Sequence, residues 1–548
     1  MTKNGEISAQ NVPLAYLILT VVTLFAFWPS LSAGFLNWDD PSIFLRNPLV
    51  FSTDLHGLWR IFLQTDSHNK TYIPLTILSF AWEQKLFGVH PFTSHLINLL
   101  LHVVCSWLVC VLALRMGLSR VAAFLGALIF ALHPLRVESV AWVTERKDVL
   151  FVLFYLAAMR AYWDYAGGLR KGRYVIALLC AAASVLAKPM ALSLPLVLFL
   201  LDERAGRRWT TAAFWDKVPF MLALWPIAGI TFVMNQHPLA LPGTASLGIL
   251  AWSATFYVEK FFWPMGLSAF YLAPGAAQFT ESALLVALLG VVSWALRRDR
   301  WWRFALLFYI ITMFFMWRLD YYDGPRGLVH DRFMYLPSLG FTLCLGAWLD
   351  QWRAGPSFVR WGKITWLGIG IVTALLAGYT FNRCFVWQNS WTYWGEVLDS
   401  APKNYFALLN RAAYLVEGDA QEIYGWPKRL RLLLARDDLR RATLIAPKDP
   451  DVWQNLGIVL TKLGEDAKAE EALKMAVHLA PVRATIYNDW GNYYLHRGDW
   501  RNALRNYNTA LQLKPSYPEA LFNRALLFEW MRKNLPPAGS KPSPEGKL

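Results

Sequence analysis

Twelve apolar runs, separated by short charged stretches, dominate the first 380 residues of this chain. They lie near residues 12–30, 94–114, 118–135, 149–165, 174–187, 189–201, 215–234, 247–263, 281–296, 302–317, 333–349 and 361–380. Continuous runs of roughly 13 to 22 apolar residues are typical of helices that cross a bilayer. The 28 Trp residues, many of them at run ends, agree with interfacial belts. The sequence therefore predicts an all-α, polytopic membrane protein.

The basic residues indicate how the runs are oriented. The net charge is +15, but Lys and Arg fall mostly between apolar runs, so the positive-inside rule explains the charge better than a nucleic-acid partner. The clusters are Arg115 and Arg120; Arg170, Lys171 and Arg173; Arg204, Arg207 and Arg208; Arg297, Arg298, Arg300 and Arg303; and Arg353, Arg360 and Lys363. Placing them all in the cytoplasm with an internal N-terminus gives about eleven crossings, provided that 247–263 re-enters or lies in the interface.

Two details complete this topology. The segments 174–187 and 189–201 are short and meet at Lys188-Pro189, so they form a tight hairpin or one kinked helix, and the basic clusters on both sides favour the hairpin. No small-residue cleavage site follows the first run, which indicates a retained anchor. The five cysteines show no metal-ligand spacing and are expected in the core.

The predicted topology gathers four polar stretches on one outer face. They are residues 31–93, 133–148, 235–280 and 318–332. The first contains GFLNWDDPSIFLRNP, in which Asp39 and Asp40 stand side by side just after a membrane segment. Ionisable groups beside hydrocarbon are costly, so this pair is a candidate functional site, with a solvated acidic pair in a loop as the alternative.

Two other polar groups along the chain carry alternative interpretations. His95, Asn98 and His102 recur on one helical face, where interhelical hydrogen bonds are a better explanation than ligation. Asp320 and Asp323 frame two tyrosines without a decisive metal geometry, which leaves room for a divalent cation but makes no cofactor certain.

A different composition begins after about residue 389. Pro447, Pro481 and Pro515 are 34 residues apart, and the sequence between them follows the tetratricopeptide pattern. In each unit a glycine, Gly457 or Gly491, lets two antiparallel helices pack closely. We expect a membrane domain at 1–389, a repeat domain at 390–534 and a disordered tail at 535–548. The repeat domain includes a degenerate first repeat at 404–447, with an insertion around 418–430, and a capping helix at 518–532.

The order of these motifs resembles the transmembrane and tetratricopeptide-repeat containing protein O-mannosyltransferases and their bacterial relatives, within the GT-C glycosyltransferases. The resemblance includes the NWDD loop, YIPLTILSFAWEQKLFGVHPFTSHLINLLLHVV, HPLRVESVAWVTERKDVL, DRFMYLPSLGF and the repeats. It implies a GT-C helical bundle and an enzyme that moves a sugar, mannose or another hexose, from a polyprenyl-phosphate donor to Ser/Thr hydroxyls of an acceptor protein outside the cytoplasm. In that family an acid of the first external loop is the base, so Asp39 and Asp40 are the catalytic candidates.

The chemistry predicts further site residues. Cations neutralise a departing phosphate, and polar side chains orient the substrate hydroxyls. The candidates for donor phosphate and sugar binding are His133, Arg136, Glu138, Arg146, Lys147, Asp148, Lys188, Arg326 and Arg332, with His330 as an additional polar group. Two departures from the family pattern affect this set: Ile73 stands where an Arg is common before Pro-Leu, and Pro189 stands where relatives often have an acid.

The expected partners are the lipid-linked donor, the bilayer and an acceptor protein, without nucleic acid. The repeats would hold the acceptor, with a structural spacer role as the alternative. The expected location is the bacterial inner membrane with external repeats, or the endoplasmic reticulum membrane of a eukaryote. Two other classes stay open. A transporter or lipid flippase would need charges at mid-membrane and inverted repeats. A non-catalytic envelope scaffold would tolerate replacement of Asp39 and Asp40.

Overall fold

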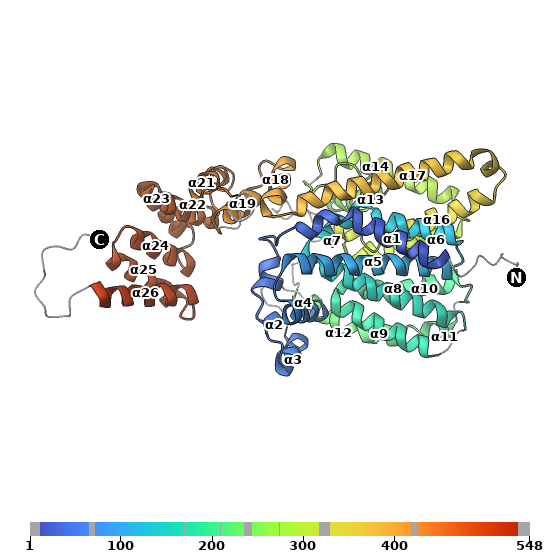
Figure 1. Cartoon of the computed structure of the whole chain (residues 1–548), viewed down its shortest axis with the longest axis horizontal. Coiled ribbons are helices and arrows are strands. Elements are labelled where there is room, and N and C mark those ends of the chain that lie inside the picture. The colour runs from blue at the N-terminus through green and yellow to red at the C-terminus, as the bar shows by residue number, and fades with distance from the viewer. Residues whose placement is uncertain are drawn as a thin grey trace, which may run out of the picture. The chain divides into compact units, whose positions relative to one another are not determined.

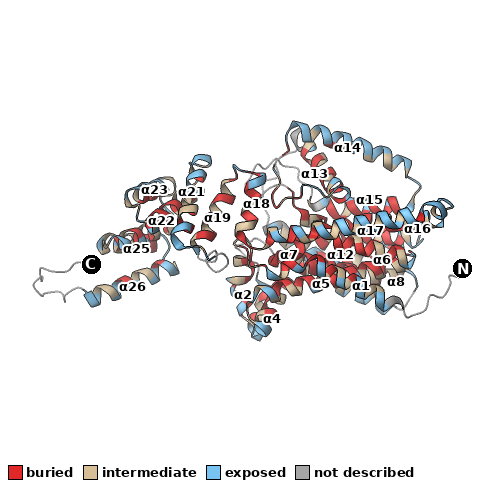
Figure 2. Cartoon of the chain, turned by 45° about the horizontal axis from the view of Figure 1, so that its top comes forward, coloured by how far each residue is buried: buried red, intermediate tan, exposed pale blue. Residues whose placement is uncertain are grey.

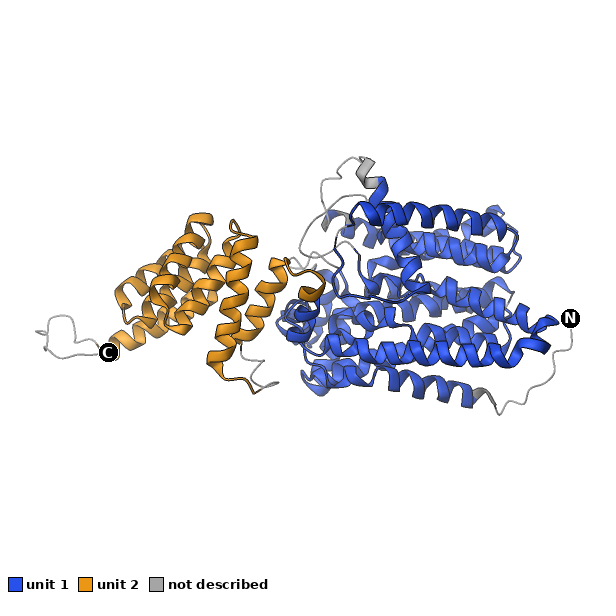
Figure 3. Ribbon diagram, turned by 90° about the horizontal axis from the view of Figure 1, so that it is seen from above, with its two compact units in different colours: residues 1–396 blue, residues 397–548 orange. Residues whose placement is uncertain are grey.

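A computed structural model describes residues 11–64, 72–168, 171–208, 210–234, 244–272, 274–316, 329–417 and 425–534. Throughout these ranges the regular structure is helical, and no β-strand occurs in them. The chain forms two compact units, Met1–Glu396 and Val397–Leu548 (Figure 3). The division falls a few residues after the boundary expected at 389.

The first unit is a bundle of helices. Its helices are α1 (Asn11–Ala26), α2 (Pro48–Phe51), α3 (Leu55–Leu63), α4 (Pro74–Phe87), α5 (Pro91–Arg115), α6 (Arg120–Leu132), α7 (Val137–Ala141), α8 (Arg146–Ala166), α9 (Gly172–Ala187), α10 (Leu194–Arg204), α11 (Thr211–Trp215), α12 (Val218–Met234), α13 (Thr244–Phe262), α14 (Ala276–Ala295), α15 (Arg300–Met313), α16 (Leu339–Ala354) and α17 (Ser357–Cys384). Helix α18 (Ser390–Ser400) crosses the division between the units at Glu396. Several helices of the first unit run nearly parallel through the bundle (Figure 1).

The core of this unit follows the contacts of a few central helices. Helix α5 packs on α6 and α8, α8 packs on α9, and α16 packs on α6 and α15. Two glycines of α16 make that packing close, because a Cβ on Gly340 or Gly346 would lie 2.9 Å from the carbonyl oxygen of Ala305 or Ala122. Small residues at such contacts let helix backbones approach one another in a membrane protein.

Outer helices expose apolar surface, as expected of a lipid-facing wall. Figure 2 shows α14 and α17 mostly exposed while the central helices are mostly buried. Among the described residues, four helices are long and apolar enough to cross a membrane: Pro91–Arg115, Val143–Ala166, Ala276–Ala295 and Ser357–Trp387. The pair Arg120–Leu132 and Pro134–Ala141, bent by 57°, makes a fifth if it is one span. The count of about eleven crossings therefore stays a prediction.

The segment after α9 reverses the chain. Helix α9 ends at Ala187, a 3-10 turn covers Pro189–Ser193, and α10 follows. Tyr174 at the start of α9 donates a hydrogen bond to the carbonyl oxygen of Asp216 (2.8 Å). Arg207, just after α10, donates both to the Asp216 carboxylate (2.6 Å) and to Asp202 in the last turns of α10 (3.2 Å). Both outer ends of the pair thus lie at one level, which is the hairpin arrangement. Helix α13 is continuous from Thr244 to Phe262, which leaves no re-entrant break in this segment, and the alternative of an interfacial helix at 247–263 stays a prediction.

The basic clusters gather at the end of the bundle where α8 ends and α9 begins. Arg115 pairs with Asp164 (3.3 Å), and Arg173 lies 3.8 Å from the same carboxylate. Arg303 pairs with Glu203. Helix α8 therefore has its basic neighbours at its C-terminal end, and the polar stretches described below at its N-terminal end.

The second unit is a helical repeat array. It contains α19 (Tyr405–Glu417), α21 (Lys428–Ile445), α22 (Pro450–Leu463), α23 (Asp466–Leu479), α24 (Ala484–His496), α25 (Trp500–Leu513) and α26 (Pro518–Asn534). A Cβ on Gly457 would meet Leu473 at 2.7 Å, and one on Gly491 would meet Tyr507 at 2.4 Å. The two glycines thus permit the close helix pairing predicted from the sequence. The expected tail at 535–548 lies outside the described residues.

Candidate active site

The first loop brings Asp40 into the protein interior. The Asp40 side chain is fully buried. Its carboxylate accepts hydrogen bonds from the Leu36 amide (2.7 Å), the Trp142 indole (3.0 Å), and both the amide (3.3 Å) and the hydroxyl (2.9 Å) of Thr144. Burial raises the pKa of Asp40 to about 7, although these hydrogen bonds oppose the shift. All the described contacts of this carboxylate are structural, and they join the loop to the segment before α8.

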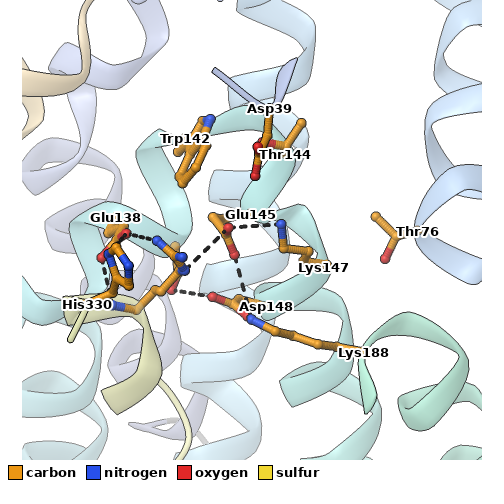
Figure 4. Close-up of polar contacts among 12 residues, drawn as sticks. Asp39, Thr76, Glu138, Trp142, Thr144, Glu145, Lys147, Asp148, Lys188 and His330 are labelled. Carbon is orange, nitrogen blue, oxygen red and sulfur yellow. Dashed lines mark hydrogen bonds and ion pairs between the residues drawn. The ribbon is translucent and has the colours of Figure 1, made fainter. Parts of the chain in front are cut away.

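Asp39 has a different environment. Its side chain is only partly buried, and its charge acts on the ammonium group of Lys147. Figure 4 shows Asp39 beside Thr144, at the edge of the charged cluster described below. Of the two adjacent aspartates, Asp39 is therefore the one that an incoming hydroxyl could reach.

Aromatic packing holds the loop in place. The Trp38 ring lies 5.2 Å from Trp142, 5.5 Å from Tyr393 and 5.3 Å from Trp394, measured between ring centroids. Aromatic pairs at such distances stabilise by about 0.5–1.5 kcal/mol beyond burial. The backbone on either side of Asp39 is thus fixed by Trp38 and Asp40.

The segment from Trp142 to Lys147 is held from its other side by α5. Asn98 donates to the carbonyl oxygens of Trp142 (3.3 Å) and Val143 (3.2 Å), and its own carbonyl oxygen accepts from Arg146 Nε (2.8 Å). Its three hydrogen bonds therefore fix the start of α8. This is the interhelical role that the sequence favoured for Asn98, and His102 also forms hydrogen bonds, to Tyr335 and Ala131.

A cluster of alternating charges lies at this end of α8 (Figure 4). We call it the charged cluster; its members are Glu138, Glu145, Lys147, Asp148, Lys188, His330 and Arg332. Lys188 pairs with Asp148 and lies 3.7 Å from Glu145. Arg332 pairs with Glu138 and lies 3.5 Å from Glu145. Lys147 lies 2.9 Å from Glu145, and His330 lies 3.7 Å from Glu138.

The acidic and basic side chains of the charged cluster differ in their exposure. The side chains of Glu138, Glu145 and Asp148 are 1–4% exposed, whereas those of Lys147, Lys188 and Arg332 are 12–14% exposed. Buried carboxylates anchor the three cations, and the cations reach the water-accessible side. Burial disfavours the charge on Arg332, but the neighbouring carboxylates raise its pKa above the ordinary value. Such a face is suited to bind an anion such as a phosphate.

Two further acidic residues, Asp331 and Glu396, lie near the charged cluster. The Asp331 carboxylate accepts a hydrogen bond from Tyr271 (2.6 Å), and burial raises the pKa of Asp331 to about 7. Glu396 pairs with Arg383 (2.8 Å) and accepts from the Ala269 amide (2.9 Å). The predicted outer stretches 31–93, 133–148, 235–280 and 318–332 thus meet through their described parts.

Three predicted site residues have structural environments instead. Arg136 is fully buried and donates to the carbonyl oxygens of Phe130, Met334 and Tyr335. Arg146 is also fully buried, pairs with Glu83 and stacks over Phe80, 4.2 Å from the ring centroid.

His133 stacks on Phe261, and its two ring nitrogens bond the Phe261 carbonyl oxygen (2.9 Å) and the Leu135 amide (3.3 Å). The described polar contacts of Arg136, Arg146 and His133 thus join segments of the bundle, and their contact with the donor stays a prediction. Arg326, Asp320 and Asp323 lie outside the described residues.

The sequence-based list omitted Glu145 and Asp331. Glu145 lies in the same TERKD string as Lys147 and Asp148, so its place in a dense run of charge was an available signal. Asp331 precedes Arg332 in the same way. In the parts of the chain that the structure describes, no group of three or more His, Cys, Asp or Glu side chains could hold a metal ion. The divalent cation therefore stays an open expectation.

Comparison with known proteins supports the resemblance read from the motifs. The family profile described as TPR repeat matches residues 491–529. The chain is 23% identical to human protein O-mannosyl-transferase TMTC3, over 96% of this chain and 63% of the relative. The Drosophila melanogaster Tmtc3 protein is 23% identical over 94% of this chain and 66% of its own length. Human TMTC4 is 33% identical over 27% of this chain and 22% of its own.

This chain thus spans about 63% of the length of TMTC3. Two solved structures are also similar. ArnT from Cupriavidus metallidurans bound to undecaprenyl phosphate has a TM-score of 0.33 and 12% identity, covering 95% of this chain and 88% of that one. MamA has a TM-score of 0.21 and 22% identity, covering 25% of this chain and 75% of that one.

Proposed function

We propose that this protein is a membrane glycosyltransferase that moves a hexose, mannose by analogy with the named relatives, from a polyprenyl-phosphate carrier to Ser/Thr hydroxyls of proteins. One observation carries the proposal. A partly buried carboxylate, Asp39, lies on a fixed loop next to a face of three cations that buried acids hold in place. Sugar transfer from a lipid phosphate needs a base on one side of the reacting carbon and cations on the other.

In this mechanism Asp39 accepts the proton of the acceptor hydroxyl. The hydroxyl oxygen forms a bond to the anomeric carbon while the bond from that carbon to the phosphate oxygen breaks, and its electron pair leaves with the phosphate. Lys147, Lys188 and Arg332 neutralise the departing phosphate. Asp40 is a positioning residue, because its described bonds join the loop to Trp142 and Thr144.

We place the reaction on the extracytoplasmic side. The support is that the charged cluster lies at the N-terminal end of α8, whereas basic residues such as Arg115 and Arg173 surround its C-terminal end. The acceptor protein would then meet the repeats on the same side, in the bacterial periplasm or the endoplasmic reticulum lumen.

The test is glycoproteomics of exported proteins from cells lacking the gene, complemented with wild type, Asp39→Asn or Asp40→Asn. We expect the glycopeptides to disappear in the deletion strain. Only the wild-type gene should restore them to their full level. Asp39→Asn should reduce transfer by about a hundred- to ten-thousand-fold, as loss of a general base does. Unchanged glycopeptides in the deletion would contradict the transferase proposal and favour the flippase or scaffold class. Full complementation by Asp39→Asn would show that Asp39 is not the base.

A further inference from the structure

Three arginines converge on one carboxylate at the end of the bundle away from the charged cluster. Asp164, in the last turn of α8, pairs with Arg160 one turn earlier on the same helix. Arg115 in the last turn of α5 lies 3.3 Å from this carboxylate, and Arg173 in the first turn of α9 lies 3.8 Å from it. We call Arg115, Arg160 and Arg173 the arginine triad. Its members come from three neighbouring helices, because α8 packs on both α5 and α9 (Figure 1).

The triad carries more positive charge than its carboxylate neutralises. Among the described residues, Asp164 is the only carboxylate that pairs with any of the three arginines. Three positive charges and one negative charge leave an excess of two positive charges at this point. The first turn of α9 contains no acid that would reduce this excess.

Other acids at this end of the bundle are matched by cations of their own. Asp202, in the last turns of α10, pairs with the buried Lys217 and with Arg207 (3.2 Å). Asp216 pairs with the same arginine (2.6 Å). The two acids and two cations of this network cancel, so they do not supply the negative charge that the triad lacks.

Two arginines of the triad reach the surface, whereas their acid does not. The side chains of Arg115 and Arg173 are each 47% exposed, compared with 17% for Arg160 and 2% for Asp164. A guanidinium group has five N–H donors, and an ion pair with one carboxylate oxygen uses only part of them. Arg115 and Arg173 are thus held by a buried acid and keep donors for a second anion on their exposed side.

Exposed apolar side chains adjoin the triad on α9. Val175, Ile176 and Leu179, in the two turns after Arg173, are 54%, 45% and 65% exposed. In a membrane protein, exposed apolar side chains on an outer helix contact acyl chains, and arginines at the helix end lie at the level of the headgroups. The triad and this part of α9 therefore offer an anion site directly beside a surface for hydrocarbon.

We propose that the arginine triad binds the phosphate headgroup of an anionic phospholipid, whose acyl chains lie against α9. The net negative charge of such a lipid matches the excess charge of the triad, and basic pockets between membrane helices bind such headgroups. A zwitterionic phospholipid gains less, because its own ammonium group balances its phosphate. Dissolved inorganic phosphate gains less as well, because it has no contact with Val175, Ile176 and Leu179. The site lies at the other end of α8 from the proposed transfer site, and its binding of lipid does not rest on the proposed function.

The test is native mass spectrometry of the delipidated full-length protein in detergent, with phosphatidylglycerol or phosphatidylcholine added. Both lipids contain a phosphodiester, but only phosphatidylglycerol has a net negative charge. We expect the wild type to bind phosphatidylglycerol about tenfold or more tightly than phosphatidylcholine. Excess inorganic phosphate should displace no more of the bound phosphatidylglycerol than chloride does at the same ionic strength.

Variants of the two exposed arginines localise the effect. Arg115→Gln with Arg173→Gln should weaken binding of phosphatidylglycerol by about tenfold or more and leave phosphatidylcholine binding unchanged. Arg160 still pairs with the buried Asp164 in this double variant, so we expect it to fold. Each single variant should lose about fivefold, which keeps the test available if the double variant is unstable.

Arg303→Gln is the matched control. Arg303 is as exposed as Arg115, at 47%, but it pairs one to one with Glu203 (3.4 Å). Its substitution should change phosphatidylglycerol binding by less than about twofold. Thermal unfolding of every variant checks that the bundle stays folded.

Three results would overturn the proposal. They are equal binding of the two lipids by the wild type, an unchanged preference for phosphatidylglycerol in the folded double or single variants, and specific displacement of this lipid by inorganic phosphate, which would assign the triad to a dissolved anion. None of them would decide the transferase function, since the assay contains neither sugar donor nor acceptor.

Discussion

The Trp142 indole donates a hydrogen bond of 3.0 Å to the Asp40 carboxylate across 102 residues of sequence. This bond, together with those from Thr144, fastens the first loop to the segment that begins α8. The neighbouring Asp39 and Lys147 extend from the two fastened segments. The hydrogen bonds of Asp40 therefore fix the position of the proposed base, Asp39, relative to the proposed phosphate site.

The pH dependence of stability should reveal the buried state of Asp40. Its pKa of about 7 in the folded protein lies above the ordinary 3.8, so from about pH 4 to 7 the folded state holds a proton that the unfolded state has lost. The contribution of Asp40 to the free energy of unfolding therefore falls as pH rises through this window. Thermal unfolding of wild type and Asp40→Asn between pH 5 and 7.5 measures it. The wild type should lose up to about 1.4 kcal/mol per pH unit relative to the variant, and parallel curves would contradict this.

Removing Lys188 should separate its structural and functional roles. Lys188→Met leaves the buried Asp148 without its cation, which should cost about 3–5 kcal/mol of unfolding free energy. The double variant Lys188→Met/Asp148→Asn should recover most of this loss, because no uncompensated charge remains. The KM of this double variant for the lipid-linked donor should nevertheless remain above the wild-type value, because the Lys188 cation is still missing. A double variant with normal donor kinetics would remove Lys188 from the phosphate site.

Substitutions of the adjacent residues Arg146 and Lys147 at the start of α8 should differ in effect, the first mainly lowering stability and the second mainly lowering transfer. Arg146→Met breaks a buried pair with Glu83 and bonds to Asn98 and Ser94, so we expect a stability loss of about 3–5 kcal/mol. Lys147→Met removes a partly exposed cation and should lower transfer with a much smaller change in melting temperature. Melting curves and transfer rates of both variants provide the measurement. Equal destabilisation by both would show that Lys147 is structural.

Gly491 should be essential to the packing of the repeats. A Cβ at this position would lie 2.4 Å from Cε1 of Tyr507, so Gly491→Ala should destabilise the array by about 1–3 kcal/mol. Gly378→Ala on α17 is the control, since a Cβ there meets nothing within 4 Å. Hydrogen exchange of α24 and α25 in the full-length protein reports the change. Unchanged protection of these two helices would contradict the packing argument.

Local patterns predicted the elements of this protein well. Long apolar runs specify helices, and 34-residue spacing with Gly457 and Gly491 specifies paired repeat helices, because both signals lie within one element or between neighbours. The same patterns placed Asp40 and Arg332 in polar stretches that the structure brings together, and Lys188 at a break between two apolar runs that joins them. They did not distinguish Arg146 from Lys147, two adjacent cations in one charged string.

That distinction was decided by tertiary structure alone. Arg146 points into the contact with Glu83 and Asn98, while Lys147 lies beside Glu145 with 14% of its side chain exposed. Likewise, only the fold buries Asp40 under Trp142 and leaves Asp39 accessible. The sequence by itself determined the helices, the repeats and which stretches are polar. The packing of distant segments decided which charges are enclosed, because desolvation and ion pairing depend on neighbours that lie far away along the chain.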